Sequence, residues 1–187
     1  MLAILAQFLG DTSAKKLHAT IETLFELCAK TNSETVRQSI CKAIPQLSRY
    51  MSEKAKTYLM QQLTVLQETR DEAILKGTAY VVAGLFKAKG MKVLQEMNTI
   101  SIFAESYFQT RKSDYVRKVA GLNLFEALSF SMGRSFELYI DQVFPQILGS
   151  ISDQKEVVRQ AAIGALKRIM ANFSNYAIKQ ALPQFLA

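Results

Sequence analysis

The segment EVVRQAAIGALKRI at residues 156–169 contains the pattern that decides the fold. It carries a Val-Arg pair, and an alanine follows three residues after the arginine. Similar phrases occur earlier, as YVRKVAGLNLFEAL at 115–128 and as TVRQSICKAI at 35–44. A phrase that returns in this way indicates a structural unit that the chain uses several times.

The basic residue of the phrase recurs at nearly even intervals. It falls at Arg37, Lys76, Arg117 and Arg159, which are 39, 41 and 42 residues apart. Periods of about 40 to 47 residues are typical of HEAT and armadillo arrays, in which each unit contains two or three helices. We therefore predict an all-α solenoid of antiparallel helix pairs that winds as a right-handed superhelix.

The apolar residues follow the period of a helix. In the last unit they fall at i, i+3, i+4, i+7, i+8 and i+11 and form one stripe: Val158, Ala161, Ala162, Ala165, Leu166 and Ile169. The chain has only 8 Gly and 3 Pro, which disfavours architectures of strands and tight turns. We expect outer helices near 14–30, 52–68, 91–111, 135–151 and 175–186, and inner helices near 33–49, 71–88, 114–131 and 154–172.

Candidate helix-capping residues support these boundaries. Polar N-cap candidates precede the inner helices at 32–34, 113–114 and 152–156, and Gly90 is placed to end the second inner helix. The whole of 1–187 is expected to be one HEAT-repeat block of about four repeats with partial helices at its ends. Both ends are apolar, whereas the terminal repeats of a complete solenoid need polar outer faces, so we expect a fragment of a longer solenoid.

No constellation of catalytic or metal-binding residues is evident in the sequence. His18 is the sole histidine, and the two cysteines, Cys28 and Cys41, lack the spacing of a zinc site and are expected to be buried thiols in a reducing compartment. Neither a P-loop nor a dinucleotide-binding glycine motif occurs, and no apolar run reaches the length of a membrane helix. We predict no enzyme activity, no cofactor, no metal, no small-molecule substrate and no membrane partner.

The recurring basic residue lies near the start of each inner helix, so Arg37, Lys76, Arg117 and Arg159 should form a ladder along one edge. The favoured interpretation is structural, with each cation bonded to an acid or a carbonyl of a neighbouring repeat. The alternative is a ladder that contacts a ligand.

Other cations gather at the turns between helices, in a chain whose net charge is +7. Because turns of successive repeats stack, they are expected to form a basic strip, which can hold phosphates by charge with little sequence preference. The alternative is a solvated edge that keeps the protein soluble. The candidates for contact with a polyanion are Lys87, Lys89, Arg111, Lys112, Arg117 and Arg134.

One segment is more specific than the residue pattern that HEAT repeats share in general. KGTAYVVAGLFK at 76–87 resembles K-G-A-A-Y-G-L-A-G-L-V-K of the large general-control translational activators, whose middle portion is similar to the HEAT region of fungal elongation factor three. Further phrases match that family in order and spacing over about 33–187: IPQL at 44–47, LFE at 124–126, GRSFELYI at 133–140, FPQIL at 144–148, VRQAA at 158–162 and LPQFL at 182–186. The sequence departs from the family at Val81, at the turn 87–90 and at Leu138.

The resemblance implies a cytoplasmic, ribosome-associated scaffold. It would help to activate the kinase that phosphorylates initiation factor 2 alpha during amino-acid starvation. The implied partners are the ribosome, through ribosomal proteins and ribosomal RNA, and an ATP-binding-cassette protein and the kinase through the full-length protein. The alternative is a protein-binding adaptor of another HEAT class, such as a nuclear transport receptor or a phosphatase scaffold; the net positive charge disfavours a receptor for basic cargo.

Overall fold

The computed structural model of the protein describes residues 14–48, 54–108, 114–175 and 179, and every regular element in these ranges is a helix. In chain order the elements are α2 (Ala14–Lys30), α3 (Glu34–Leu47), α4 (Lys54–Glu68), α5 (Glu72–Lys89), α6 (Met91–Glu96), α7 (Thr99–Ser106), α8 (Tyr115–Met132), the 3-10 helix η3 (Gly133–Tyr139), α9 (Ile140–Ile151) and α10 (Glu156–Met170).

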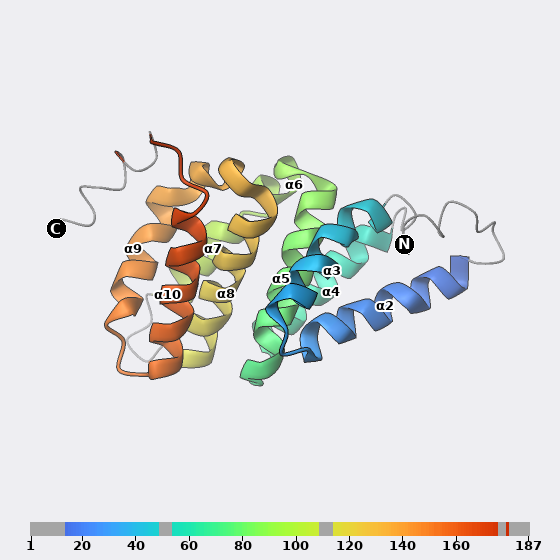
Figure 1. The fold of residues 1–187 in the computed structure, drawn as a ribbon, viewed down its shortest axis with the longest axis horizontal. Coiled ribbons are helices and arrows are strands. Elements are labelled where there is room, and N and C mark those ends of the chain that lie inside the picture. The colour runs from blue at the N-terminus through green and yellow to red at the C-terminus, as the bar shows by residue number, and fades with distance from the viewer. Residues whose placement is uncertain (1–13, 49–53, 109–113, 176–178, 180–187) are drawn as a thin grey trace.

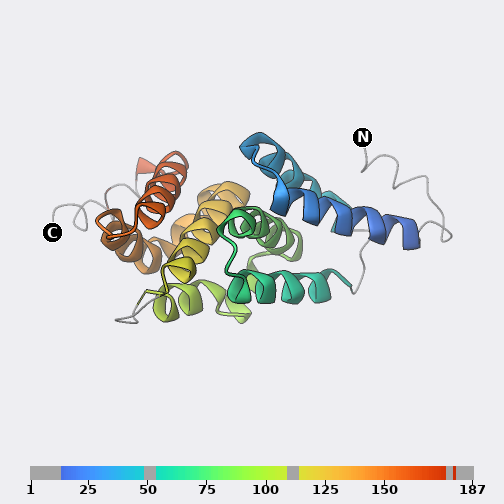
Figure 2. The same ribbon diagram turned by 90° about the horizontal axis from the view of Figure 1, so that it is seen from below.

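The helices stack in order along the long axis of the molecule (Figure 1). Helices α3, α5, α8 and α10 form the inner layer, in which each packs against the next. Helices α2, α4, α7 and α9 alternate with them and form most of the outer layer, which Figure 2 shows from below. This arrangement confirms the all-α solenoid expected from the repeat.

Buried aromatic and aliphatic side chains fill the space between the layers. The largest fully buried ones are spread over the repeats: Tyr80, Phe86, Phe103, Phe125, Phe136 and Phe144. The predicted stripe of the last repeat is seen in α10, where Val158, Ala162, Ala165 and Ile169 are buried. Both cysteines are free thiols buried in the core, as expected.

The inner helices begin and end near the predicted positions because of local capping. The side chains of Ser33, Asp71 and Asp114 accept hydrogen bonds from backbone N–H groups in the first turns of α3, α5 and α8. Helices α5 and α8 end at Gly90 and Gly133, whose φ angles are +90° and +58°. Glycine reaches these angles without steric cost, so the chain can leave the helix there.

Two predicted outer helices differ from the structure. The expected helix at 91–111 is broken into α6 and α7, because Asn98 adopts a left-handed conformation with φ +47°. Asparagine tolerates that conformation better than most residues, and it turns the chain between the two pieces. The first part of the expected helix at 135–151 is the 3-10 helix η3, and α9 begins only at Ile140. Most of the helix expected at 175–186 lies outside the described residues.

Prolines do not end the helices that contain them. Pro45 lies inside α3 and Pro145 inside α9, and both helices continue beyond the proline. Pro183 lies outside the described residues. Within the described ranges, no helix combines the length and the apolar character that crossing a bilayer requires.

Candidate functional site

The inner layer presents two edges with different chemistry. All four inner helices run in the same direction, so their first turns share one edge and their last turns share the other (Figure 1). We call these the N-terminal edge and the C-terminal edge. They are separated by the length of α8, 18 residues, or about 27 Å at the rise of an α-helix.

Two of the four ladder residues bind the loop of their own repeat. Arg37 donates to the carbonyl oxygen of Thr31, and Arg159 donates to that of Asp153 at 2.9 Å. Each acceptor lies six residues before its arginine. These contacts tie the turn before an inner helix to the first turn of that helix, rather than joining neighbouring repeats.

Lys76 is the ladder residue that joins neighbouring repeats. Its Nζ lies 3.4 Å from a carboxylate oxygen of Glu34 on α3 and 3.2 Å from one of Glu126 on α8. Tyr80, one turn further along α5, donates its hydroxyl to Glu34 as well. Three inner helices are therefore linked through one ammonium group.

Arg117 and two further cations of the N-terminal edge also have partners in the protein. The guanidinium of Arg117 lies 5.8 Å from the centre of the Tyr107 ring. Arg70 forms an ion pair with Asp114, and Lys118 lies 2.6 Å from Asp153. Arg70 and Lys118 are thus neutralised by carboxylates and are poor candidates for binding a polyanion, whereas Arg117 contacts an aromatic ring and keeps its charge.

The C-terminal edge carries cations of another kind. Lys87 and Lys89 lie in the last turn of α5, and Arg134 follows the end of α8 and is exposed. Lys87 borders a shallow pocket that also contains Met132 and Ser135, which brings these two segments together. Among the described residues, none of the three is recorded in an ion pair.

Two more cations join this edge through one aromatic ring. Lys42 of α3 lies 5.3 Å and Arg168 of α10 lies 5.1 Å from the centre of the Phe130 ring on α8. Sequence reasoning did not propose Lys42, although its position late in an inner helix placed it at this edge. The basic cluster therefore comprises Lys42, Lys87, Lys89, Arg134, Lys167 and Arg168.

The single basic strip expected from the sequence is wrong. Lys87, Lys89 and Arg134 lie at the C-terminal edge, whereas Arg117 lies at the opposite edge, because α8 carries the chain from one edge to the other. Arg111 and Lys112 lie outside the described residues. Turns before and after an inner helix belong to different edges, and the sequence argument had merged them.

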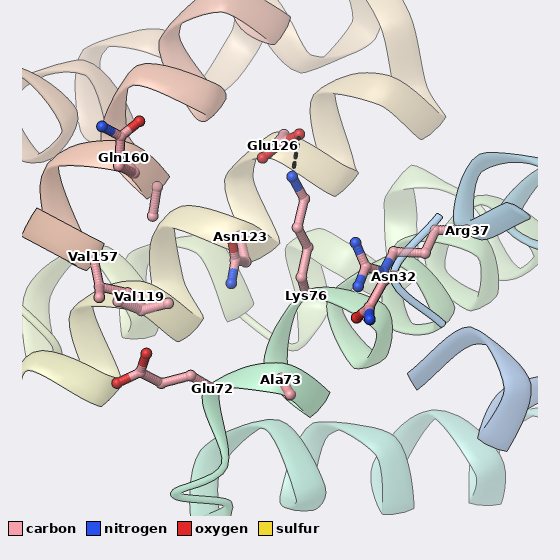
Figure 3. Close-up of a pocket in the computed structure, with 11 residues that line it drawn as sticks. Asn32, Arg37, Glu72, Ala73, Lys76, Val119, Asn123, Glu126, Val157 and Gln160 are labelled. Carbon is pink, nitrogen blue, oxygen red and sulfur yellow. Dashed lines mark ion pairs between the residues drawn. The ribbon is translucent and has the colours of Figure 1, made fainter. Parts of the chain in front are cut away.

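A polar pocket of about 460 Å³ lies on the inner layer near the N-terminal edge (Figure 3). It lies between α5, α8 and α10, with Asn32 and Arg37 at one side, and Figure 3 shows Lys76 reaching across from α5 to Glu126. The remaining lining residues are Glu72, Ala73, Val119, Asn123, Val157, Gln160 and Ala161.

Lys76, Glu34, Glu126 and Tyr80 form one polar network, and the pKa values of its two glutamates are shifted in opposite directions. Burial raises the pKa of Glu126 above its ordinary value, and the nearby Lys76 only partly offsets this effect. Burial acts in the same direction on Glu34, but hydrogen bonds from Tyr80 and the charge of Lys76 bring the pKa of Glu34 below its ordinary value. Glu126 is thus the less compensated carboxylate.

Sequence reasoning missed this network and named only Lys76 and Arg37 of its members. A signal was present, because Asn123 and Glu126 interrupt an otherwise apolar stretch of α8. Within the described ranges, no group of three or more His, Cys, Asp or Glu side chains is arranged to hold a metal ion.

Comparisons with known proteins agree with the fold. The family model of the EF3 N-terminal HEAT repeat matches residues 75–187, which is more than half of the chain. No solved structure matches the chain.

The chain is also similar to much longer proteins. It is 32% identical over 182 residues to "eIF-2-alpha kinase activator GCN1" of Saccharomyces cerevisiae, an alignment that covers 96% of this chain and 7% of the relative. It is 29% identical to "Stalled ribosome sensor GCN1" of Homo sapiens over 95% of this chain and to "Protein ILITYHIA" of Arabidopsis thaliana over 91%, and each alignment covers 6% of the relative. The resemblance read from the sequence phrases is confirmed, and the chain spans less than a tenth of the length of these relatives.

Proposed function

Because the chain belongs to the EF3 N-terminal HEAT repeat family, we propose that it is a non-catalytic scaffold segment that associates with ribosomes in the cytoplasm. Similarity to proteins named as a stalled ribosome sensor and as an eIF-2-alpha kinase activator supports a role in translational control. Through the full-length protein, the segment would help to activate the initiation-factor kinase during amino-acid starvation, together with an ATP-binding-cassette partner.

The unpaired cations of the C-terminal edge are the observation that carries this proposal. Ribosomal RNA presents phosphates along its surface, and lysine and arginine bind phosphates by charge without reading a sequence. At the N-terminal edge, carboxylates already pair with Arg70, Lys76 and Lys118. We therefore assign RNA contact to the cluster formed by Lys87, Lys89 and Arg134 with their neighbours Lys42 and Lys167. Arg117 lies at the opposite edge and is a separate candidate.

Co-sedimentation with purified ribosomes over a salt series tests the assignment. The double variant Lys87→Glu/Lys89→Glu reverses two cations in a Lys-x-Lys pair of the C-terminal edge. The matched control is Lys54→Glu/Lys56→Glu, an equally spaced exposed pair on the outer helix α4. Because each phosphate contact contributes a slope of about −0.7 to −0.9 in log affinity against log salt, the first variant should pellet less and show a shallower salt slope.

The control variant carries the same change in net charge and should pellet like the parent. Equal losses in the two variants would show that only total charge matters, which would contradict the assignment of the C-terminal edge. Absence of pelleting by the parent chain at low salt would contradict ribosome association of this segment.

A further inference from the structure

The polar pocket of the inner layer is lined by three carboxamides whose side chains bond to no part of the chain that the structure describes. They are Asn32 before α3, Asn123 of α8 and Gln160 of α10. Asn32 and Gln160 are exposed. Asn123 is only 6% exposed, yet neither polar atom of its amide is sealed from solvent, and Figure 3 shows its side chain in the middle of the pocket. A buried amide that the fold leaves unpaired but reachable points to a ligand.

The charged groups that line the pocket balance one another. Its two cations, Arg37 and Lys76, are matched in number by two carboxylates, Glu72 and Glu126. Lys76 lies 3.2 Å from Glu126, and Arg37 donates to the carbonyl oxygen of Thr31. A site with no net charge attracts neither a phosphate nor a free cation strongly, so these walls favour a neutral polar ligand.

A carboxamide carries a carbonyl oxygen that accepts and an NH2 group that donates, so its natural complement is another amide. The peptide main chain repeats that group at every residue. Helices and sheets pair their own N–H and C=O groups, so only an extended or irregular segment presents both to a partner. We propose that this pocket binds the main chain of an extended segment of a partner polypeptide, held by the amides of Asn32, Asn123 and Gln160.

Aliphatic side chains complete the pocket and favour a polypeptide over a nucleobase, which is also neutral and also carries donors and acceptors. Ala73, Val119, Val157 and Ala161 line it, and Val157 is 42% exposed. None of the lining residues is aromatic, whereas unpaired bases are held largely by stacking on aromatic rings. An apolar side chain of the bound segment would cover Val157 while its main chain meets the amides.

The position of the pocket separates this inference from the proposed RNA contact. Asn123 lies in the first half of α8, whereas the basic cluster gathers where the inner helices end. The volume of about 460 Å³ lies within the range of pockets that bind small ligands. Recognition through the main chain gives affinity with little preference for sequence. The inference does not depend on ribosome association.

Titration of the 187-residue chain with a short uncharged peptide tests the proposal. The probe is acetyl-Gly-Val-Gly-Val-Gly-amide, and the comparison is the same peptide with an ester in place of the central amide, which keeps the planar geometry but removes one N–H donor. Nuclear magnetic resonance would follow the side-chain amides of Asn32, Asn123 and Gln160. We expect saturable shifts with the peptide and binding about two- to twelvefold weaker with the ester, the loss of one hydrogen bond between neutral groups.

Variants of the lining residues make the site assignment falsifiable. Asn123→Leu removes the buried amide at nearly constant volume, and Gln160→Ala removes an exposed amide and leaves the core intact. Each should weaken peptide binding several-fold, whereas Gln67→Ala, which removes an exposed amide on the outer helix α4, should leave it unchanged.

Three outcomes would overturn the proposal. Absence of saturable shifts in the millimolar range would mean that water alone occupies the amides. Equal affinity of the ester peptide, or affinity that Gln160→Ala leaves unaltered, would mean that the main chain is not what the pocket holds. Stronger shifts of the same resonances by a short single-stranded uridine RNA would make the pocket part of the RNA contact. Because the titration contains no ribosome, its result is independent of the pelleting experiment.

Discussion

At the scale of the residue, Gly77 shows how closely two repeats approach each other. A Cβ at this position would lie 2.0 Å from the carbonyl oxygen of Cys28 and 2.5 Å from the Cα of Ala29. Both atoms belong to the backbone of α2, which cannot move aside as a flexible side chain would. Only a residue without a side chain allows α5 to pack against α2 at this distance.

We therefore expect Gly77→Ala to lower the free energy of unfolding by about 3 kcal/mol or more, since overpacking alone costs about 1 to 3 kcal/mol. The control is Gly149→Ala in α9, where a Cβ would meet no atom within 4 Å. Alanine favours a helix over glycine by about 0.5 to 1 kcal/mol, so this variant should be slightly more stable than the parent. Urea unfolding measures both, and equal stabilisation of the two variants would contradict the close approach of α2 and α5.

At the scale of the element, ion pairs connect the start of one inner helix to the loop before the next. Lys118 on α8 lies 2.6 Å from Asp153, which also accepts a hydrogen bond from the backbone N–H of Lys155. Burial would raise the pKa of Asp153, but the hydrogen bonds from Lys118 and from the backbone of Lys155, together with the charges of Lys118 and Arg159, hold the pKa below its ordinary value. The charged form of Asp153 is therefore favoured in the folded state.

Asp153→Asn should lower the free energy of unfolding at neutral pH by about 1.5 to 3 kcal/mol, the range for hydrogen bonds to charged groups. Because the pKa of Asp153 is lowered on folding, its contribution is complete above the unfolded pKa of about 3.9. It is lost as the pH falls through the folded-state pKa, so the parent and the variant should converge in acid. Urea unfolding over a pH series measures this convergence. Asp141→Asn, an exposed acid on α9, serves as the control and should change little.

The positions of the helices could be predicted from the sequence better than the side-chain contacts between repeats. Helix periodicity and caps located α2, α3, α5 and α8 closely, because these signals are local in sequence. The break at Asn98 was not predictable from periodicity, since apolar residues continue on both sides of it. The bridge from Lys76 to Glu34 and Glu126 was missed because its members are 42 and 50 residues apart. A repeat period places equivalent residues at equivalent positions, but it does not state which residue of the neighbouring repeat each one meets.

At the scale of the whole molecule, each helix contacts only its neighbours in the stack. Helix α5 packs against α2, α3, α4 and α8, whereas α10 packs against α8 and α9. In an array of this kind, stability is close to a sum of the repeats and their nearest-neighbour interfaces, so a local defect spreads only as far as those interfaces carry it. The position of a core substitution should therefore decide how much of the chain it loosens.

Phe86→Ala in α5 and Ile169→Ala in α10 test this, since both side chains are buried, at 0% and 1% exposure. We expect Phe86→Ala to speed amide hydrogen exchange in α3 and α8 on both sides of it. Ile169→Ala should act chiefly on α8, α9 and α10 and leave α2 and α3 protected. Truncations of this size cost about 2 to 5 kcal/mol, which is enough to measure by exchange with mass spectrometry. Equal loss of protection in α2 and α10 after Ile169→Ala would show that the chain opens as one cooperative unit, because only global unfolding couples helices that share no interface.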